Sequence, residues 1–256
     1  MTLYLTGIPS IDAVFQSVFT TGYMITLTGT PGSGIELLSK QFSVQGIGNQ
    51  QVLYITTSER EVDVIETMKR FNWKSDIKII SIGNDYYETV LAKEIAVSKY
   101  REEGVQAPKI IEMAEGNASF EEYYSPNYIT KVIYEIFKIK PPMRVVIDSL
   151  DFFLEEYDSK SVISLLRLIR SHALKNESEV LITLTSDMRE KWIESAIEDI
   201  SDGVIKLIKS VKDGQIIQDL IIWRIRNHPE KTAVFKYGFT ENGISITQEL
   251  DKFSIK

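Results

Sequence analysis

Short apolar runs rich in β-branched residues recur through the first 210 positions, with stretches of helical spacing between them. The runs lie at residues 24–28, 52–57, 77–82, 145–148, 180–184 and 204–208. Uninterrupted apolar runs of this kind are typical of strands buried on both faces by covering helices. The pattern therefore predicts an α/β fold with a largely parallel central sheet and helices on both faces.

The last part of the chain has a different pattern. Strand-like segments at residues 216–225, 233–237 and 243–246 are separated by the turn-forming pairs Asp213-Gly214 and Asn242-Gly243. Strands joined by such short turns pair as antiparallel neighbours. An antiparallel extension of the sheet is therefore predicted over residues 210–250.

Residues 85–128 follow neither pattern. A charged helix is expected over residues 86–103, and the polar stretch around residues 115–117 is expected to form a loop. The region carries no recognisable motif and is interpreted as an insertion. No repeat or linker divides the sequence, so residues 1–256 are predicted to form a single domain.

Composition and charge narrow the classes of partner. The chain has 256 residues, no cysteine and a formal net charge of -7, which opposes the counterion release that drives binding to nucleic acid. No nucleic-acid partner is therefore expected. Only His172 and His228 remain as imidazole ligands, so no metal site is expected. No apolar run approaches the roughly 18 residues that span a bilayer, and the N-terminus lacks leader features, so we expect a cytoplasmic protein with no membrane partner.

The first predicted strand runs into a glycine-rich loop, Gly29-Thr30-Pro31-Gly32-Ser33-Gly34, which is followed by a predicted helix. Glycines allow successive backbone N–H groups to turn inward and form an anion-binding nest at a helix N-terminus. A strand, this spacing and a helix together are the setting of a phosphate-binding P-loop. The alternative is a glycine-rich turn that only joins strand to helix.

The next two residues lack the chemistry that a triphosphate requires. An intact loop continues with Lys, which bonds the β- and γ-phosphates, and with Ser or Thr, which ligates Mg²⁺. This chain has Ile35 and Glu36 instead. Losing the lysine removes charge-assisted hydrogen bonds of about 1.5–3 kcal/mol each, and a carboxylate about 4 Å from a phosphate adds a repulsion of up to about 4 kcal/mol. ATP and magnesium are therefore expected to bind weakly or not at all, and Lys40, one turn further on, is expected to be a solvated surface lysine.

Together with segments before and after the loop, the sequence resembles the KaiC-like branch of the RecA superfamily, which is common in archaea, over most of its length. The segment Thr6-Gly7-Ile8-Pro9-Ser10-Ile11-Asp12 is similar to the family's opening TGIxGxD motif, although only Gly22 remains of the glycines that usually follow. Residues 200–205 and 239–244 are similar to the family's ADGVI and FEITDKGI segments. The resemblance implies a RecA-like P-loop fold. The superfamily favours ring oligomers, and a dimer or monomer is an equal alternative where no nucleotide bridges the subunits.

Two acidic positions of the family's catalytic site are matched in part. Residues 53–59 resemble the strand that ends in paired glutamates in active relatives, and here the pair is Ser58-Glu59. Ser58 matches the water-activating base, and Glu59 replaces it only if the turn shifts by one residue. Residues 143–150 resemble the Walker B strand, whose aspartate, here Asp148, orients the magnesium shell in relatives. Glu59 and Asp148 are therefore the candidate catalytic residues, and both are expected to be vestigial.

The segment Arg224-Ile225-Arg226-Asn227 resembles the family's KxRG motif. In hexameric relatives the first and third residues of this motif reach the phosphates of a neighbouring subunit's nucleotide, which implies the same role for Arg224 and Arg226. The alternative is that two arginines alternating along a strand form its solvent face.

Changes at Ile35, Glu36 and Ser58 affect the phosphate clamp, the metal ligand and the base, whereas the scaffold motifs are retained. We therefore expect a pseudo-ATPase that acts as a regulatory or assembly subunit, through a protein partner or self-association. Peptide binding in the emptied cleft is one form of this hypothesis. The first alternative is an unconventional ATP-binding protein or slow ATPase that uses Glu59 and Asp148, and the second is a recombinase-like DNA-binding protein.

Overall fold

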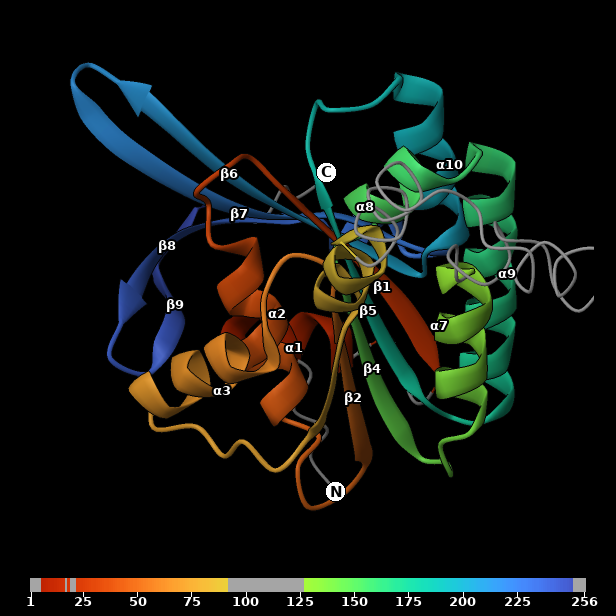
Figure 1. Cartoon of the computed structure of the whole chain (residues 1–256). Helices are drawn as coiled ribbons and strands as arrows, with labels where there is room; N and C mark the ends of the chain where they lie inside the picture. Colours follow the sequence, from red (N-terminus) through yellow and green to blue (C-terminus); the bar gives the residue numbers. More distant parts are fainter. Residues whose placement is uncertain (1–5, 17, 19–21, 92–126, 251–256) are drawn as a thin grey trace, which may run out of the picture.

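One sheet runs through the described residues of the computed structural model, which are 6–16, 18, 22–91 and 127–250. Its nine strands are β1 (Tyr23–Gly29), β2 (Gln51–Thr56), β3 (Lys78–Ser81), β4 (Met143–Asp148), β5 (Glu179–Thr185), β6 (Gly203–Lys212), β7 (Gln215–Ile225), β8 (Ala233–Thr240) and β9 (Gly243–Leu250). They lie in the order β3-β2-β4-β5-β1-β6-β7-β8-β9 (Figure 1). The first six in this order are parallel to one another, and β7, β8 and β9 pair in antiparallel fashion. The predicted parallel sheet with an antiparallel C-terminal extension is confirmed.

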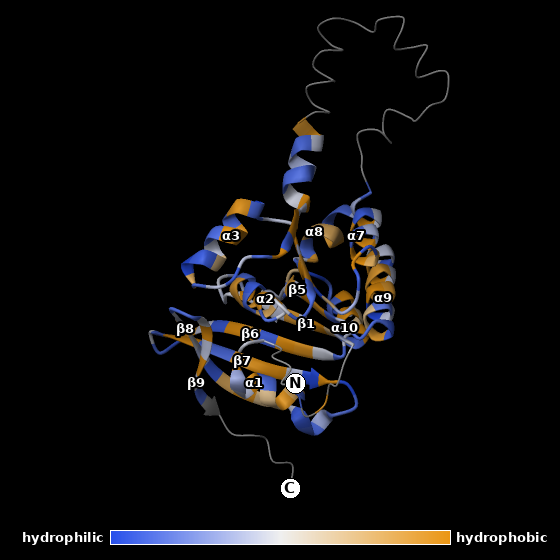
Figure 2. Cartoon of the chain, turned by 90° about the horizontal axis from the view of Figure 1, so that it is seen from below, coloured by the Kyte–Doolittle hydropathy of each residue, from blue (hydrophilic) through white to orange (hydrophobic). Residues whose placement is uncertain are grey.

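Helices cover both faces of the sheet, as the apolar pattern predicts. They are α1 (Pro9–Gln16), α2 (Ile35–Val44), α3 (Glu61–Arg70), α7 (Tyr128–Phe137), α8 (Asp151–Glu156), α9 (Ser159–Lys175) and α10 (Lys191–Ile200). The first three share one apolar cluster with the sheet, and α7 to α10 share a second cluster on the opposite face. Figure 1 shows these two groups of helices on opposite sides of the sheet. In Figure 2 orange gathers along the strands, whereas the helices carry both colours because one side of each faces solvent.

The predicted insertion is described only in part. Residues 82–91 are helical, in agreement with the start of the charged helix expected over residues 86–103. This helix also shortens the strand predicted at 77–82, which ends at Ser81. Residues 92–126, which hold the rest of the predicted helix and the predicted polar loop, lie outside the described residues.

The opening segment is held together by the buried carboxylate of Asp12. It accepts hydrogen bonds from the Thr6 backbone N–H at 2.7 Å, the Thr6 hydroxyl at 2.7 Å and the Gly7 backbone N–H at 3.1 Å. Burial raises the pKa of this carboxyl, and these hydrogen bonds work against that rise. Asp12 therefore holds Thr6 and Gly7, at the start of the segment, against α1.

A buried ion pair lies at the amino ends of β4 and β5, at the opposite edge from the P-loop. The Arg144 guanidinium pairs with the Glu179 carboxylate, donates to the Phe42 carbonyl at 2.9 Å and donates to the Gln50 side chain at 2.8 Å. Burial raises the pKa of the Glu179 carboxyl, and the charge of Arg144 opposes this rise. The guanidinium therefore joins α2 to the sheet through charge as well as packing.

We expect Arg144→Met to lower the free energy of unfolding by about 3–5 kcal/mol, because it leaves the Glu179 carboxylate buried without its cation. The double variant Arg144→Met/Glu179→Leu removes both charges and is expected to recover part of this loss. Urea unfolding followed by circular dichroism measures both. A double variant no more stable than the single one would show that the pairing is not the cause.

Candidate functional site

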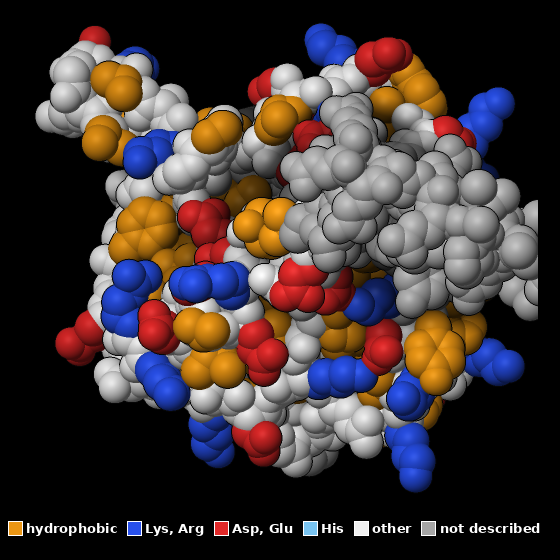
Figure 3. All heavy atoms as spheres, in the orientation of Figure 1, with side chains coloured by type: hydrophobic (Ala, Val, Ile, Leu, Met, Phe, Trp, Pro, Cys, Tyr) orange, Lys and Arg blue, Asp and Glu red, His pale blue; other side chains and the backbone are white. Residues whose placement is uncertain are grey.

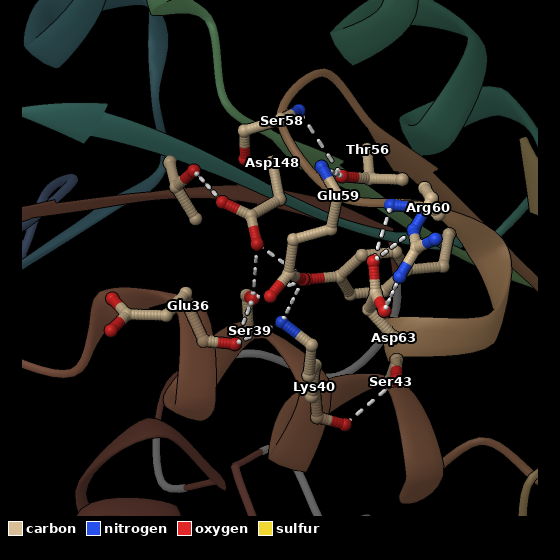
Figure 4. Close-up of polar contacts among 12 residues, drawn as sticks. Glu36, Ser39, Lys40, Ser43, Thr56, Ser58, Glu59, Arg60, Asp63 and Asp148 are labelled. Carbon is tan, nitrogen blue, oxygen red and sulfur yellow. Dashed lines mark hydrogen bonds and ion pairs between the residues drawn. The ribbon is translucent and has the colours of Figure 1, made fainter. Parts of the chain in front are cut away.

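The candidate site lies at the carboxyl edge of the parallel strands, where α/β proteins place their ligands. The P-loop follows β1, the segment that carries Glu59 follows β2, and Asp148 ends β4. The space-filling view shows a hollow in the face that contains this edge (Figure 3). Figure 4 shows that Glu59 and Asp148 both point towards α2, which begins directly after the P-loop.

Two glycines of the P-loop have left-handed backbone conformations. Gly32 and Gly34 have positive φ values of 74° and 89°, a conformation that glycine adopts without strain. The Thr30 N–H donates to the Leu207 carbonyl at 3.1 Å, and the Ser33 carbonyl accepts from the Tyr237 hydroxyl at 2.6 Å. The loop is therefore fastened to β6 on one side and to β8 on the other.

Gly34 is also required by its surroundings. A Cβ at this position would lie 2.7 Å from the Phe239 ring. The ring of Phe239, itself 48% exposed, thus closes over the last glycine of the loop. The sequence does not single out Tyr237 or Phe239 as a site residue, because both fit the apolar alternation of an ordinary strand.

Ile35 and Glu36 occupy the first turn of α2. The Ile35 Cγ2 atom lies 2.3 Å from the position that a Cβ on Gly29 would take, and the side chain packs against the apolar cluster of α1 to α3. Glu36 is exposed and lines the hollow beside the loop. The position after the last glycine is therefore filled by an aliphatic side chain, and the next one presents a carboxylate to solvent.

The Asp148 carboxylate is surrounded by hydroxyl groups. Ser39 donates to its Oδ2 atom at 2.9 Å, the Tyr54 hydroxyl donates to the same atom, and Thr183 donates to Oδ1 at 2.8 Å. Burial raises the pKa of Tyr54 well above its usual range, and the charge of Asp148 adds to the rise, so the phenol keeps the proton that it donates. Both oxygens of this carboxylate are therefore engaged within the chain.

Lys40 is buried, and its prediction as a solvated surface lysine was wrong. The side chain is 1% exposed, its Nζ atom lies 2.5 Å from the Glu59 carboxylate, and it donates to the Glu36 carbonyl at 3.1 Å. Helical spacing placed Lys40 one turn from the P-loop, but only the tertiary structure shows that the segment after β2 covers it. Figure 4 shows this ion pair linking α2 to that segment.

Glu59, rather than Ser58, faces the site. The Thr56 hydroxyl accepts hydrogen bonds from the Glu59 N–H at 3.0 Å and from the Ser58 N–H at 3.4 Å, which fixes the turn after β2. The carboxylate of Glu59 then reaches Lys40 and the hollow. Of these two residues, Glu59 is therefore the one that lines the hollow.

The hollow beside the P-loop has a volume of about 410 Å³. It is lined by Gly32, Gly34, Glu36, Leu37, Lys40, Glu59, Thr67, Arg70, Phe71 and Phe239. Its charged groups are the Lys40–Glu59 pair, Glu36 and Arg70, so acidic and basic side chains are equal in number. The hollow reaches Gly34 and Glu36 on either side of Ile35, but Ile35 itself does not line it, and the lining is partly apolar through Leu37 and the two phenylalanine rings.

Arg224 and Arg226 both contact the C-terminal end of α10 in the same chain. The Arg224 guanidinium donates to the carbonyls of Glu198 and Ser201 at 2.5 and 3.0 Å. Arg226 donates to the Ile200 carbonyl at 3.1 Å, and its Nε atom lies 3.3 Å from the Asp202 carboxylate. Cations at a helix C-terminus stabilise the exposed carbonyls there. These contacts give the two arginines a structural role, which differs from the solvent face of a strand.

The described residues contain no group of three or more His, Cys, Asp or Glu side chains placed to hold a metal ion. They also contain no helix long and apolar enough to cross a membrane.

The tie between β8 and the P-loop can be tested with Tyr237→Phe. Burial, with the charges of Glu36 and Asp219, raises the pKa of Tyr237 to about 12. A phenol whose pKa is higher in the folded state stabilises that state fully below its unfolded pKa of about 10 and loses this effect as the pH rises towards 12. We expect the variant to be about 1 kcal/mol less stable at pH 7 and the difference to shrink above pH 10.

Urea unfolding of both proteins at pH 7 and pH 11 measures this difference. Tyr87→Phe is the control, because Tyr87 is 63% exposed and its loss should leave stability unchanged. An equal loss of stability for Tyr237→Phe at both pH values would contradict the expectation.

The sequence and the fold of this chain are similar to those of known proteins. The family model described as "ATPase: KaiC" matches residues 4–251. The UPF0273 protein PF1931 of Pyrococcus furiosus is 23% identical over 94% of this chain and 92% of its own length, and a UPF0273 protein of Thermotoga maritima is 22% identical over 94% of each. The crystal structure of the KaiC-like protein PH0186 of Pyrococcus horikoshii aligns with a TM-score of 0.62 at 20% identity, covering 95% of this chain and 97% of that one. This chain therefore belongs to the KaiC ATPase family and has its RecA-like fold.

Proposed function

We propose that this chain is a pseudo-ATPase of the KaiC family, a protein that keeps the P-loop fold, does not turn over ATP and acts as a regulatory or assembly subunit through protein contacts. Its P-loop is degenerate in this proposal, because Ile35 and Glu36 replace the phosphate-binding lysine and the magnesium-binding hydroxyl. Protein contacts, with a partner or with a second copy, then carry the function.

The observation that carries the proposal is the occupation of Asp148. A Walker B aspartate that orients a magnesium shell needs a free oxygen, and both oxygens here accept hydrogen bonds from hydroxyls of the same chain. The Ser39 and Tyr54 hydroxyls also lie 2.7 Å from each other, so the group around this carboxylate is a closed network within the chain. A magnesium shell would have to compete with this network for the carboxylate, which supports a site that does not use Mg²⁺-ATP.

A second support comes from the charges around the P-loop. The nearest buried cation on α2, Lys40, is already neutralised by Glu59 at 2.5 Å. Glu36 presents a negative charge to the hollow in which an anion would lie. A polyphosphate would meet this carboxylate without the charge-assisted hydrogen bonds that hold it in intact P-loops.

One observation favours the alternative of an unconventional ATPase, namely the position of Glu59. Its carboxylate faces the hollow beside the P-loop, where a base would have to stand. This alternative requires a measurable rate of hydrolysis that Glu59→Gln abolishes. A rate no higher than the buffer blank in the unchanged protein would remove it.

Isothermal titration of the full chain with ATP and Mg²⁺ tests the proposal. We expect a dissociation constant above about 1 mM for the unchanged chain. Restoring the missing groups with Ile35→Lys/Glu36→Thr should tighten binding at least about tenfold, because one new charge-assisted contact is worth about 1.5–3 kcal/mol.

A matched control separates this local effect from a change in net charge. Leu168→Lys/Leu174→Lys also makes the chain more positive by two charges, at positions of α9 that are 42% and 44% exposed. It should leave ATP binding unchanged. Micromolar binding with turnover in the unchanged chain would refute the pseudo-ATPase.

A further inference from the structure

The outer face of α7 and α9 carries a group of aromatic and aliphatic side chains. The two helices lie side by side over the sheet (Figure 1). The Phe137 ring of α7 stacks on the His172 ring of α9, with 3.9 Å between the ring centroids. Tyr134 lies about one turn before Phe137, and Leu168 about one turn before His172. These four residues are here called the α7–α9 patch.

Most of the α7–α9 patch is open to solvent. Tyr134, Phe137 and Leu168 are 61%, 42% and 42% exposed. Both helices already bury a separate apolar stripe against the sheet, so the core does not require these side chains. A contiguous apolar group on the outside of a folded domain indicates an interaction surface.

Cations surround this patch. Lys138 and Lys140 follow the end of α7, whereas Arg167 and Lys175 belong to α9, and all four are exposed. None of the four takes part in an ion pair within residues 6–16, 18, 22–91 and 127–250. Figure 3 shows blue side chains around orange ones over α7. Their charges are therefore available to a partner.

Few carboxylates oppose these cations. Glu135 of α7 is paired with Lys78 of β3, and α9 contains no acidic residue. Glu177, which follows α9, is exposed and is the nearest further carboxylate along the chain. This face is therefore positive, although the whole chain has a net charge of -7. The complementary partner is acidic.

The rings and the helices indicate what kind of acidic partner fits. The Lys138 ammonium lies 5.5 Å from the centroid of the Tyr134 ring, and His172 covers one face of Phe137. One face of each ring is thus already occupied, which disfavours stacking on nucleic-acid bases. Two helices packed side by side instead offer a third helix side-chain ridges with which it can interdigitate. Docking of an amphipathic helix through its apolar side is a common mode of peptide recognition.

We infer that the α7–α9 patch binds an acidic amphipathic helix of a partner protein. Its apolar side lies on Tyr134, Phe137 and Leu168, and its carboxylates pair with Lys138 and Lys175. The inference rests on the proposed function, since it names the chemistry of the protein partner. Turnover of ATP would refute the pseudo-ATPase and leave peptide binding measurable, whereas failure of peptide binding would remove this partner and leave the ATP titration unaffected.

Titration of the full chain with a designed peptide tests the inference. The probe is a capped peptide of about 16 residues with leucines at i, i+3, i+4 and i+7 spacing and glutamates on its other side. We expect a dissociation constant of about 100 μM or tighter. In ¹⁵N NMR spectra the shifted amides should centre on residues 134–140 and 168–175.

Two variants separate the apolar contribution from the charge contribution. Tyr134→Ser/Leu168→Ser should weaken binding at least about tenfold, because the peptide loses two apolar contacts. Lys138→Glu/Lys175→Glu should weaken it at least about tenfold and should bind the same peptide better when lysines replace its glutamates. Circular dichroism should show both variants folded, since all four side chains are exposed.

The matched control for charge is Lys69→Glu/Lys191→Glu, which changes the net charge equally at exposed positions of α3 and α10. It should bind the acidic peptide within about twofold of the unchanged chain. A peptide that does not bind at about 1 mM, or an equal loss in the control, would overturn the inference. Tighter binding of an oligothymidylate of about 20 nucleotides or of phosphatidylserine vesicles than of the peptide would also overturn it, because the face would then recognise a nucleic acid or a membrane.

Discussion

The hydrogen bonds to Asp148 join the elements that meet at the carboxyl edge of the sheet. Ser39 comes from α2, Tyr54 from β2 and Thr183 from β5, and all three donate to the carboxylate that ends β4. The group is buried, so each donor without an acceptor would carry the cost of an unpaired polar group. The start of α2, and with it the P-loop, is therefore tied to the centre of the sheet without a bound ligand.

Several charged and polar groups around the P-loop are likewise paired within the chain. Lys40 and Glu59 form an ion pair at 2.5 Å, and the Tyr237 hydroxyl donates a hydrogen bond to the Ser33 carbonyl. Arg226 donates to a carbonyl at the C-terminal end of α10. In each case the partner lies far away in the sequence or on another element. A site built in this way holds its shape by internal contacts.

The apolar side chains of the sheet are covered in its parallel part and exposed at one end of its antiparallel part. The two faces of the parallel sheet are covered by helices, and the apolar side chains there lie in two closed clusters. The antiparallel extension instead continues past its neighbours, because β6 and β7 are longer than the strands beside them. The apolar alternation that buries Leu207 and Leu220 in the core runs on into solvent at Val211 and Ile216. The projecting end of this hairpin, residues 208–218, is thus a direct result of strand length.

The sequence by itself determined the parallel sheet, its antiparallel extension, the helices on both faces and the P-loop between β1 and α2. These features depend on local periodicity and on glycine conformation, which a single sequence displays. It also determined which residues follow the loop, since Ile35 and Glu36 are visible without coordinates.

Only the tertiary structure decided the environment of Lys40, the carboxylate that faces the site and the donors to Asp148. Lys40 and Glu59 are 19 positions apart and belong to different elements, so neither spacing nor composition brings them together. Ser39, Tyr54 and Thr183 look like ordinary helix and strand residues until the strand order places β2 and β5 on either side of β4. Burial and charge pairing arise from long-range packing, and for that reason they could not be predicted from the chain alone.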